Sequence, residues 1–232
     1  MRKISSILMT VLLGALCLTG CGSTDNNTAT DRNVSSAAVS SPAADAESNV
    51  ASDNEDSDLL SGKHHIKIKV KDYGTISVEL DADVAPITVT NFVDLAKDGF
   101  YDGLTFHRII SGFMIQGGDP LGNGTGGSDK TIKGEFSENG VENSISHVRG
   151  TISMARSQDY DSASSQFFIM HKDAPHLDGA YAAFGKVTKG QDIVDKIAEV
   201  ETDFRDAPLE PQMMIKVTAD TFGVDYPEPE KC

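Results

Sequence analysis

The sequence of 232 residues contains no tryptophan and only three cysteines. Cys17 and Cys21 lie near the amino end and Cys232 is the last residue, so no disulfide framework can span the middle of the chain. Basic residues are also scarce, because 20 Lys and Arg stand against 35 Asp and Glu, a formal net charge of −15. This balance excludes a nucleic-acid-binding protein that works by neutralising phosphates.

The amino end carries an apolar run from Ile4 to Leu18, which follows the basic residues Arg2 and Lys3. The run is too short for an ordinary membrane-spanning helix but is typical of the central region of a signal peptide. We therefore predict that residues 1–20 are a signal peptide of the lipoprotein type.

The sequence Leu18-Thr19-Gly20-Cys21 resembles the lipobox of bacterial lipoproteins, in which the cysteine receives a diacylglyceryl group. It predicts lipidation at Cys21 and an extracytoplasmic location, lipid-anchored to the bacterial membrane. Two alternatives remain open at this point: a short membrane anchor, and a plain secretory signal in which the cysteine is accidental.

The composition changes between the signal and the folded part. Residues 22–62 are dominated by Ser, Ala, Asn, Asp and Thr, contain no aromatic residue and carry eight acids against the single Arg32. We predict a lipid-anchored, disordered acidic linker over 21–62, a folded domain over 63–224 and a flexible tail over 225–232.

Hydrophobic periodicity divides the folded part into eight short strands and two helices. The predicted strands are 66–70, 75–80, 105–108, 113–116, 151–155, 166–170, 182–187 and 213–218, and the predicted helices run from Ala85 and Pro86 towards Gly99 and over 192–200. The connections are too varied for regular βαβ units, so the pattern favours one mainly antiparallel barrel or sandwich.

Several familiar motifs fail on their context. Gly122, Gly124 and Gly127 have the spacing of a dinucleotide fingerprint, but no helical pattern follows them, so we predict a surface loop. The six histidines form no ligand pair of recognised spacing, and no Gly-x-Ser-x-Gly elbow is present. We expect no metal, no other cofactor and no hydrolase triad.

The densest feature is the segment from Phe106 to Asp119. If it folds as strands, Arg108, Met114 and Gln116 can share one face, which places a cation beside apolar side chains and an amide. An arginine on a strand is usually only solvated, so this pattern alone assigns no function.

The same segment, together with several others, resembles the cyclophilin family of peptidyl-prolyl isomerases. The resemblance covers about His65 to Phe222, in the family's order and near its spacing. The segments that carry it are 106–119, 123–127, 150–155, 165–169, 177–179 and 184–187.

The resemblance implies an eight-stranded antiparallel β-barrel capped by two α-helices, and an isomerase that rotates X-Pro bonds in exported proteins and assists their folding. It implies proline-containing polypeptides as partners, with no nucleic acid, and we expect a monomer. The implied catalytic residues are Arg108, Phe113 and Gln116. The implied substrate-binding residues are Met114, Ala155, Arg156, Gln166, Phe168, His176, Leu177 and Tyr181.

Three positions depart from the best-known eukaryotic pattern. Arg156 replaces a common asparagine, Tyr181 replaces a common histidine, and His176 stands where cyclosporin-sensitive members have tryptophan. The first two are frequent in bacterial members. The alternative function is a lipoprotein that binds proline peptides as a scaffold or holdase without catalysis.

Overall fold

The structure is a computed structural model that describes residues 59–220. The predictions for the signal peptide, for Cys21, for most of the linker and for the tail lie outside these residues. The elements, in chain order, are β1 (Lys63–Val70), β2 (Gly74–Asp81), α1 (Pro86–Lys97), β3 (Thr105–Ile110), β4 (Met114–Gly117), β5 (Thr151–Met154), β6 (Phe167–Met170), β7 (Ala183–Lys189), α2 (Gln191–Ala198) and β8 (Gln212–Asp220), with single 3₁₀ turns at Ser137–Asn139 and Pro175–Leu177.

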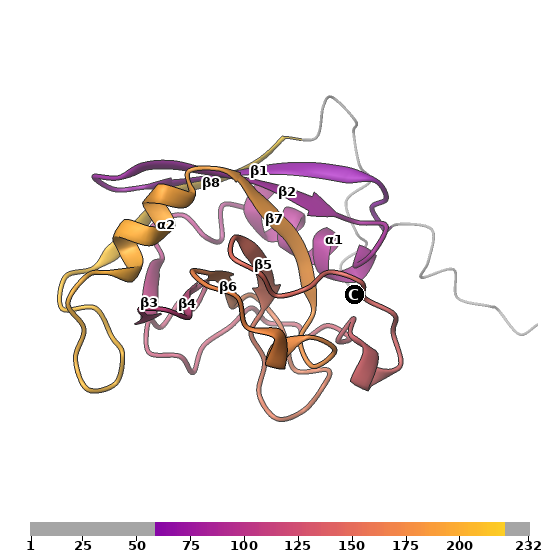
Figure 1. The fold of residues 1–232 in the computed structure, drawn as a ribbon. Helices are drawn as coiled ribbons and strands as arrows, with labels where there is room; N and C mark the ends of the chain where they lie inside the picture. Colours follow the sequence, from indigo (N-terminus) through magenta and orange to yellow (C-terminus); the bar gives the residue numbers. More distant parts are fainter. Residues whose placement is uncertain (1–58, 221–232) are drawn as a thin grey trace, which may run out of the picture. The chain divides into compact units, whose positions relative to one another are not determined.

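The eight strands close into one antiparallel barrel in the order β1-β2-β7-β5-β6-β4-β3-β8 (Figure 1). Closure depends on β8, which pairs with β1 on one side and with β3 on the other. A closed barrel has no free edge that could pair with another chain. The fold expected from the resemblance is therefore confirmed, and the sandwich is excluded.

The β1–β2 hairpin shows how the sequence pattern becomes structure. Ile68 faces Ile76 across the pair and both are fully buried, whereas the flanking lysines of β1 are exposed. The turn places Asp72 and Gly74 at φ values of 64° and 116°, a region that glycine and aspartate tolerate better than most residues. Alternation and turn chemistry therefore agree on this register.

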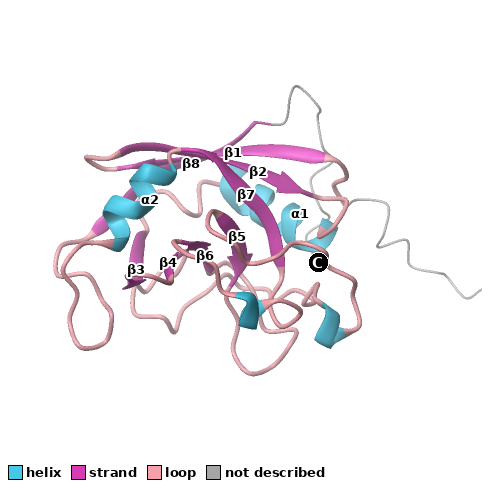
Figure 2. Ribbon diagram, in the orientation of Figure 1, coloured by secondary structure: helices cyan, strands magenta, loops and turns pink. Residues whose placement is uncertain are grey.

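The two helices cover different parts of the barrel (Figure 2). Helix α1 begins with Pro86, whose fixed φ suits the first helical position, and buries Phe92. The Phe92 ring contacts Tyr101, Phe167 and Phe184 at centroid distances of 4.8, 5.2 and 5.3 Å. These rings help to fill the core, so the barrel has a packed interior and its chemistry must lie on the outside.

Contacts with the barrel begin before β1. Leu60 is buried against the core, and its backbone N–H donates to Thr90 Oγ1 on α1 at 2.9 Å. The backbone N–H of Gly62 donates to Asp83 Oδ1 at 2.7 Å. These two hydrogen bonds fix the direction in which the chain enters β1.

Candidate active site

A single row of paired residues crosses the outer face of four strands. Arg108 of β3 lies opposite Gln116 of β4, Gln116 lies opposite Phe168 of β6, and Phe168 lies opposite Ser153 of β5. Side chains alternate between the two faces of a strand, and the neighbouring Ile109, Ile115 and Ile169 fill the interior. The row therefore faces outwards, as the alternation of Arg108, Met114 and Gln116 predicts.

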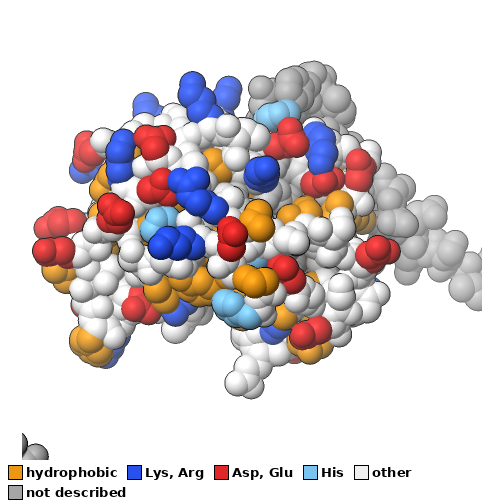
Figure 3. All heavy atoms as spheres, in the orientation of Figure 1, with side chains coloured by type: hydrophobic (Ala, Val, Ile, Leu, Met, Phe, Trp, Pro, Cys, Tyr) orange, Lys and Arg blue, Asp and Glu red, His pale blue; other side chains and the backbone are white. Residues whose placement is uncertain are grey.

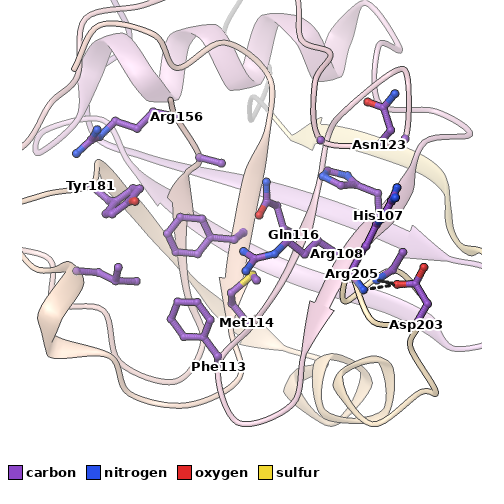
Figure 4. A pocket seen from close by; sticks show the side chains of 16 residues that line it. His107, Arg108, Phe113, Met114, Gln116, Asn123, Arg156, Tyr181, Asp203 and Arg205 are labelled. Atoms are coloured by element: carbon purple, nitrogen blue, oxygen red, sulfur yellow. Dashed lines mark hydrogen bonds between the residues drawn. The ribbon is translucent and has the colours of Figure 1, made fainter. Parts of the chain in front are cut away.

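An apolar cluster separate from the barrel core lies beside this row. It consists of Met114, Phe168, Met170, Ala174 and Leu177, with Ile110, Phe113, Ala155 and Tyr181 packed at its margin. Together with Arg108 and Gln116, many of these residues line a cavity of about 510 Å³ (Figure 4). Such a volume accepts a small ring with its flanking peptide groups.

Arg108 stands between the apolar and the polar ends of this cavity. Its guanidinium extends towards Gln116 and Met114 (Figure 4), and its side chain is 42% exposed. On its other side, Nε lies 3.5 Å from Oδ2 of Asp206. Since a guanidinium does not deprotonate in proteins, the cavity always presents a charged donor with several N–H groups.

Gln116 is held by a chain of amides. Its Nε2 donates to Gln166 Oε1 at 2.9 Å, and Gln166 Nε2 in turn donates to the carbonyl of Gly126 at 2.7 Å. Gln166 lies just before β6, and it lines a second, hydroxyl-rich cavity of about 350 Å³ rather than the first one. These hydrogen bonds therefore link Gln116 on β4 to the glycine-rich loop that contains Gly126.

Asp119 organises that loop from within. Its carboxylate accepts backbone N–H groups of Leu121, Asn123 and Gly124 at 2.8, 3.0 and 2.6 Å. Burial alone would raise the pKa of Asp119, but these hydrogen bonds and one from Gly126 outweigh burial and hold the pKa below its ordinary value. The loop is an internally braced wall of the cavity, which agrees with the surface loop predicted from its glycines.

Arg156 lies in the walls of both cavities, as the resemblance implies, but its guanidinium is already occupied. Its carbon Cζ lies 5.0, 4.9 and 4.8 Å from the ring centroids of Phe136, Tyr160 and Tyr181. It also donates to the carbonyl of Ala180 from Nη2 at 2.8 Å and from Nε at 3.1 Å. Arg156 therefore holds the wall together through its charge, and few of its donors remain for a peptide.

His176 is the one implied binding residue that lines neither cavity. It is exposed on the turn Pro175–Leu177 and stacks on the Phe113 ring at a centroid distance of 5.9 Å with an interplanar angle of 25°. It therefore lies at the rim and covers one side of Phe113.

A hydrogen-bonded group of three side chains lies behind Phe168. His147 Nδ1 is 2.9 Å from Asp178 Oδ1, its Nε2 is 3.0 Å from Ser153 Oγ, and its ring stacks on Phe168 at 6.0 Å. Burial lowers the pKa of His147, although Asp178 opposes this effect. Ser153 and His147 are buried, whereas Asp178 is exposed, so the serine hydroxyl and the imidazole cannot reach a substrate and act as a support for Phe168.

Several lining residues were missed by sequence reasoning. Asp203, Arg205 and Ala207 reach the cavity from the loop between α2 and β8 (Figure 4), and this loop has no periodicity that would have revealed them. His107 also lines the cavity, and within the described residues neither of its ring nitrogens has a hydrogen-bond partner. Burial lowers the pKa of His107, against the opposing charge of Asp119.

The side chains between residues 59 and 220 include no group of three or more His, Cys, Asp or Glu residues that could hold a metal ion. The groups that line the first cavity include the Arg108 guanidinium, the Gln116 amide and apolar side chains.

Comparison with known proteins gives a consistent family. A family model described as cyclophilin type peptidyl-prolyl cis-trans isomerase/CLD matches residues 65–219. Peptidyl-prolyl cis-trans isomerase B of Bacillus subtilis is 50% identical over 121 residues, which cover 52% of this chain and 81% of that protein. A peptidyl-prolyl cis-trans isomerase of Helicobacter pylori is 48% identical over 128 residues, 54% of this chain and 76% of that protein.

A longer relative and a solved structure extend this comparison. Peptidyl-prolyl cis-trans isomerase-like 2 of Rhizopus delemar is 44% identical over 140 residues, which span 60% of this chain but only 26% of that protein. A cyclophilin type peptidyl-prolyl cis-trans isomerase of Cryptosporidium parvum, crystallised in the presence of the dipeptide Ala-Pro, superposes with a TM-score of 0.63 at 30% identity. The match covers 68% of this chain and 99% of that one.

Proposed function

This chain belongs to the cyclophilin-type peptidyl-prolyl cis-trans isomerase family and is a peptidyl-prolyl isomerase, and on that premise we propose that it accelerates X-Pro rotation in exported polypeptides and so assists their folding outside the cytoplasm. The observation that carries the proposal is the row of Arg108, Gln116 and Phe168 at the edge of an apolar cavity. The proposed substrate is a proline-containing polypeptide chain, and the related structure crystallised with Ala-Pro supports this choice.

The chemistry requires stabilisation of a twisted amide. Rotation about an X-Pro bond breaks no covalent bond but loses amide resonance, over a barrier of about 20 kcal/mol. In the twisted state the proline nitrogen becomes pyramidal and its lone pair localises, so a donor aimed at it binds this state better than the planar one. Arg108 supplies that donor, and Gln116 beside it fixes the peptide.

The apolar walls contribute in a second way. Phe113, Met114, Phe168 and Leu177 seat the proline ring and exclude water, which disfavours the more charge-separated planar amide. A rate gain of ~10⁵ requires about 7 kcal/mol from all of these effects together.

For location, we propose that acylation of Cys21 anchors the protein to a bacterial membrane, outside the cytoplasm. The support is the lipobox-like sequence that follows a short apolar run. Among the described residues, no helix has the length and apolarity needed to cross a bilayer.

The test of the isomerase proposal is NMR exchange spectroscopy on an Ala-Pro peptide with wild-type protein and Arg108→Ala. Faster exchange with wild type, largely lost in the variant, supports the proposed mechanism. The scaffold alternative predicts a different result, in which the peptide binds and its resonances shift while the exchange rate stays at the uncatalysed value.

The anchor is tested separately by expressing the full chain with and without Cys21→Ser in a bacterium that processes lipoproteins. Wild type should fractionate with the membrane, and its amino-terminal peptide should carry the acyl mass. A soluble wild-type protein with an unmodified first residue would contradict the anchor without affecting the isomerase assignment.

A further inference from the structure

The outer face on the other side of the barrel has a distinct composition. We call it the lysine face, formed by the outward residues of β8, β1, β2 and β7. Its lysines are Lys63, Lys67, Lys69, Lys186, Lys189 and Lys216 on the strands, with Lys71 in the turn after β1. In Figure 3 basic side chains stand along the upper edge of the molecule, where β1 and β8 run in Figure 1.

Strand register places these lysines close together. Lys69 of β1 lies directly opposite Lys216 of β8, and Lys67 lies opposite Ser77, whose other neighbour is Lys189 of β7. Like charges directly opposite each other on neighbouring strands lower stability. Since the barrel core does not require charge at these outward positions, another use of the lysines would account for them.

Fewer carboxylates than lysines lie on this face, and one of them, Glu79 of β2, lies directly opposite Lys186. Lys63 forms an ion pair with Asp81, and Lys216 forms one with Asp102 at 2.8 Å. Within residues 59–220, no ion pair with a carboxylate occupies the other five lysines of the face. A chain with a net charge of −15 therefore carries a cationic surface on four adjacent strands.

The position of the face relative to the site follows from strand order. In the closed sequence β1-β2-β7-β5-β6-β4-β3-β8, β1 lies half-way round the barrel from β6, whose Phe168 forms part of the catalytic cavity. The chain also enters the barrel through β1, which is a central strand of the lysine face. A surface that contacts the lysine face would thus leave the cavity on the opposite side.

We propose that the lysine face docks on an anionic phospholipid surface and turns the catalytic cavity away from the membrane. This inference rests on the lipid anchor proposed above, because the anchor keeps the domain near the bilayer. Lysine ammonium groups suit headgroup phosphates, since they act as hydrated point charges that need no fixed geometry. The acidic remainder of the chain opposes docking little, because physiological salt screens charges beyond about 8 Å.

The test supplies the anchor chemically, so that its outcome does not depend on acylation in a cell. The chain from Cys21 to the end, with Cys232→Ser so that Cys21 is its only thiol, is coupled to a maleimide lipid in vesicles. One set of vesicles is neutral phosphatidylcholine and the other contains about 30% phosphatidylglycerol. Lysines are then acetylated briefly, and the modification at each lysine is measured by mass spectrometry.

The lysine face should be protected only on the anionic vesicles. We expect labelling of Lys67, Lys69 and Lys189 to fall roughly threefold or more there, while Lys130 and Lys133 in the loop after β4 keep their labelling. The protection should disappear at roughly 0.5 M salt. Equal labelling on both vesicles would overturn the proposal. Equal protection of the three face lysines and of the two control lysines, Lys130 and Lys133, would also overturn it.

Matched variants identify the surface that docks. Lys67→Glu/Lys69→Glu should abolish protection of Lys189, whereas Lys130→Glu/Lys133→Glu should leave it intact. Protection by free double-stranded DNA, with none from anionic vesicles, would instead assign the face to a nucleic acid and refute a membrane role. Turnover of a soluble X-Pro peptide, measured on the same vesicles, reports separately on the isomerase, because an inactive protein can still show protection.

Discussion

The two outer faces of this barrel follow the same strand alternation but carry different cations. On both, alternate residues of adjacent strands point away from a filled core. Loops contribute to the walls of the cavity on the catalytic face, which is lined by Arg108, Arg156 and Arg205 but by no lysine. On the lysine face, β1 and β2 are joined by a short turn, and the four strands carry no arginine. The planar guanidinium serves where geometry is fixed, and the ammonium serves where only charge is needed.

The largest expected effect on the catalytic face is the loss of turnover when Arg108 is removed. Arg108→Ala should lower kcat/KM by at least about 10², or roughly 2.7 kcal/mol of transition-state stabilisation, because the donor to the proline nitrogen is lost. Its partly exposed side chain adds little to folding, so the melting temperature should stay within a few degrees. Arg108→Lys should rescue poorly, since a point charge lacks the planar fork.

The matched control for this change is Lys69→Ala on the opposite face, measured by NMR exchange and thermal melting. It should keep wild-type turnover. Equal losses in the two variants would mean that the effect of Arg108 on turnover is nonspecific.

Arg156 separates structure from catalysis within the cavity wall. Arg156→Ala removes the cation from three aromatic rings and leaves the Ala180 carbonyl without its donor, which should lower the free energy of unfolding by about 2 kcal/mol. Urea unfolding measures this loss. Turnover per folded molecule should fall less than tenfold, and a fall comparable to that of Arg108→Ala would show that Arg156 contacts the substrate.

Acid should lower the stability of the folded protein through two histidines on the catalytic side of the barrel. Burial lowers the pKa values of His107 and His147 in the folded protein. Below about pH 6.5 the unfolded chain therefore binds more protons at these histidines than the folded protein does. Their contribution to stability is complete above that pH and is lost as the pH falls towards their folded pKa values. Melting temperatures at about pH 7.5 and 5.5 should show a drop that is smaller in His107→Gln and in His147→Gln. An unchanged drop in both variants would assign acid sensitivity to other groups.

Asp206 offers a finer test of how Arg108 is positioned. Both side chains of the pair are partly exposed, so Asp206→Asn should change the free energy of unfolding by less than about 0.5 kcal/mol. Asparagine also tolerates the positive φ of 64° at this position. Freed from its carboxylate, Arg108 should be less well aimed and kcat/KM should fall about threefold. Wild-type kinetics in this variant would show that the ion pair does not position the guanidinium.

The smallest effect is expected on the lysine face in free solution. Lys67→Ala/Lys69→Ala should leave turnover unchanged and shift the free energy of unfolding by less than about 0.5 kcal/mol. Lys69→Glu should be slightly stabilising, by a few tenths of a kcal/mol, because it replaces a repulsive pair with an attractive one opposite Lys216. A thermal melt at low salt measures the sign, and destabilisation by Lys69→Glu would contradict the repulsion.

The strands and the catalytic row were accessible from the sequence because both depend on alternation. Each predicted strand and helix overlaps its observed counterpart, and the spacing of Arg108 and Gln116 predicts their common face. The roles of Asp206 and His147 could not be predicted from the sequence, because barrel closure brings them to the site from distant loops without a local pattern. The environment of Arg156 was hidden for the same reason, since alternation places a residue on a face but does not reveal the rings around it.

The closure of the barrel by β8 sets the order in which this protein can mature. The first strand, β1, finds its second partner only when residues 212–220 have been synthesised, and the contacts it then makes are among the most distant in the chain. The backbone N–H of Ile109 likewise donates to the carbonyl of Asp206, which lies in the loop before that last strand. Arg108 therefore acquires its neighbour Asp206 only after the last part of the chain has joined the barrel, so any proline isomerisation in this chain before closure proceeds without its own completed site.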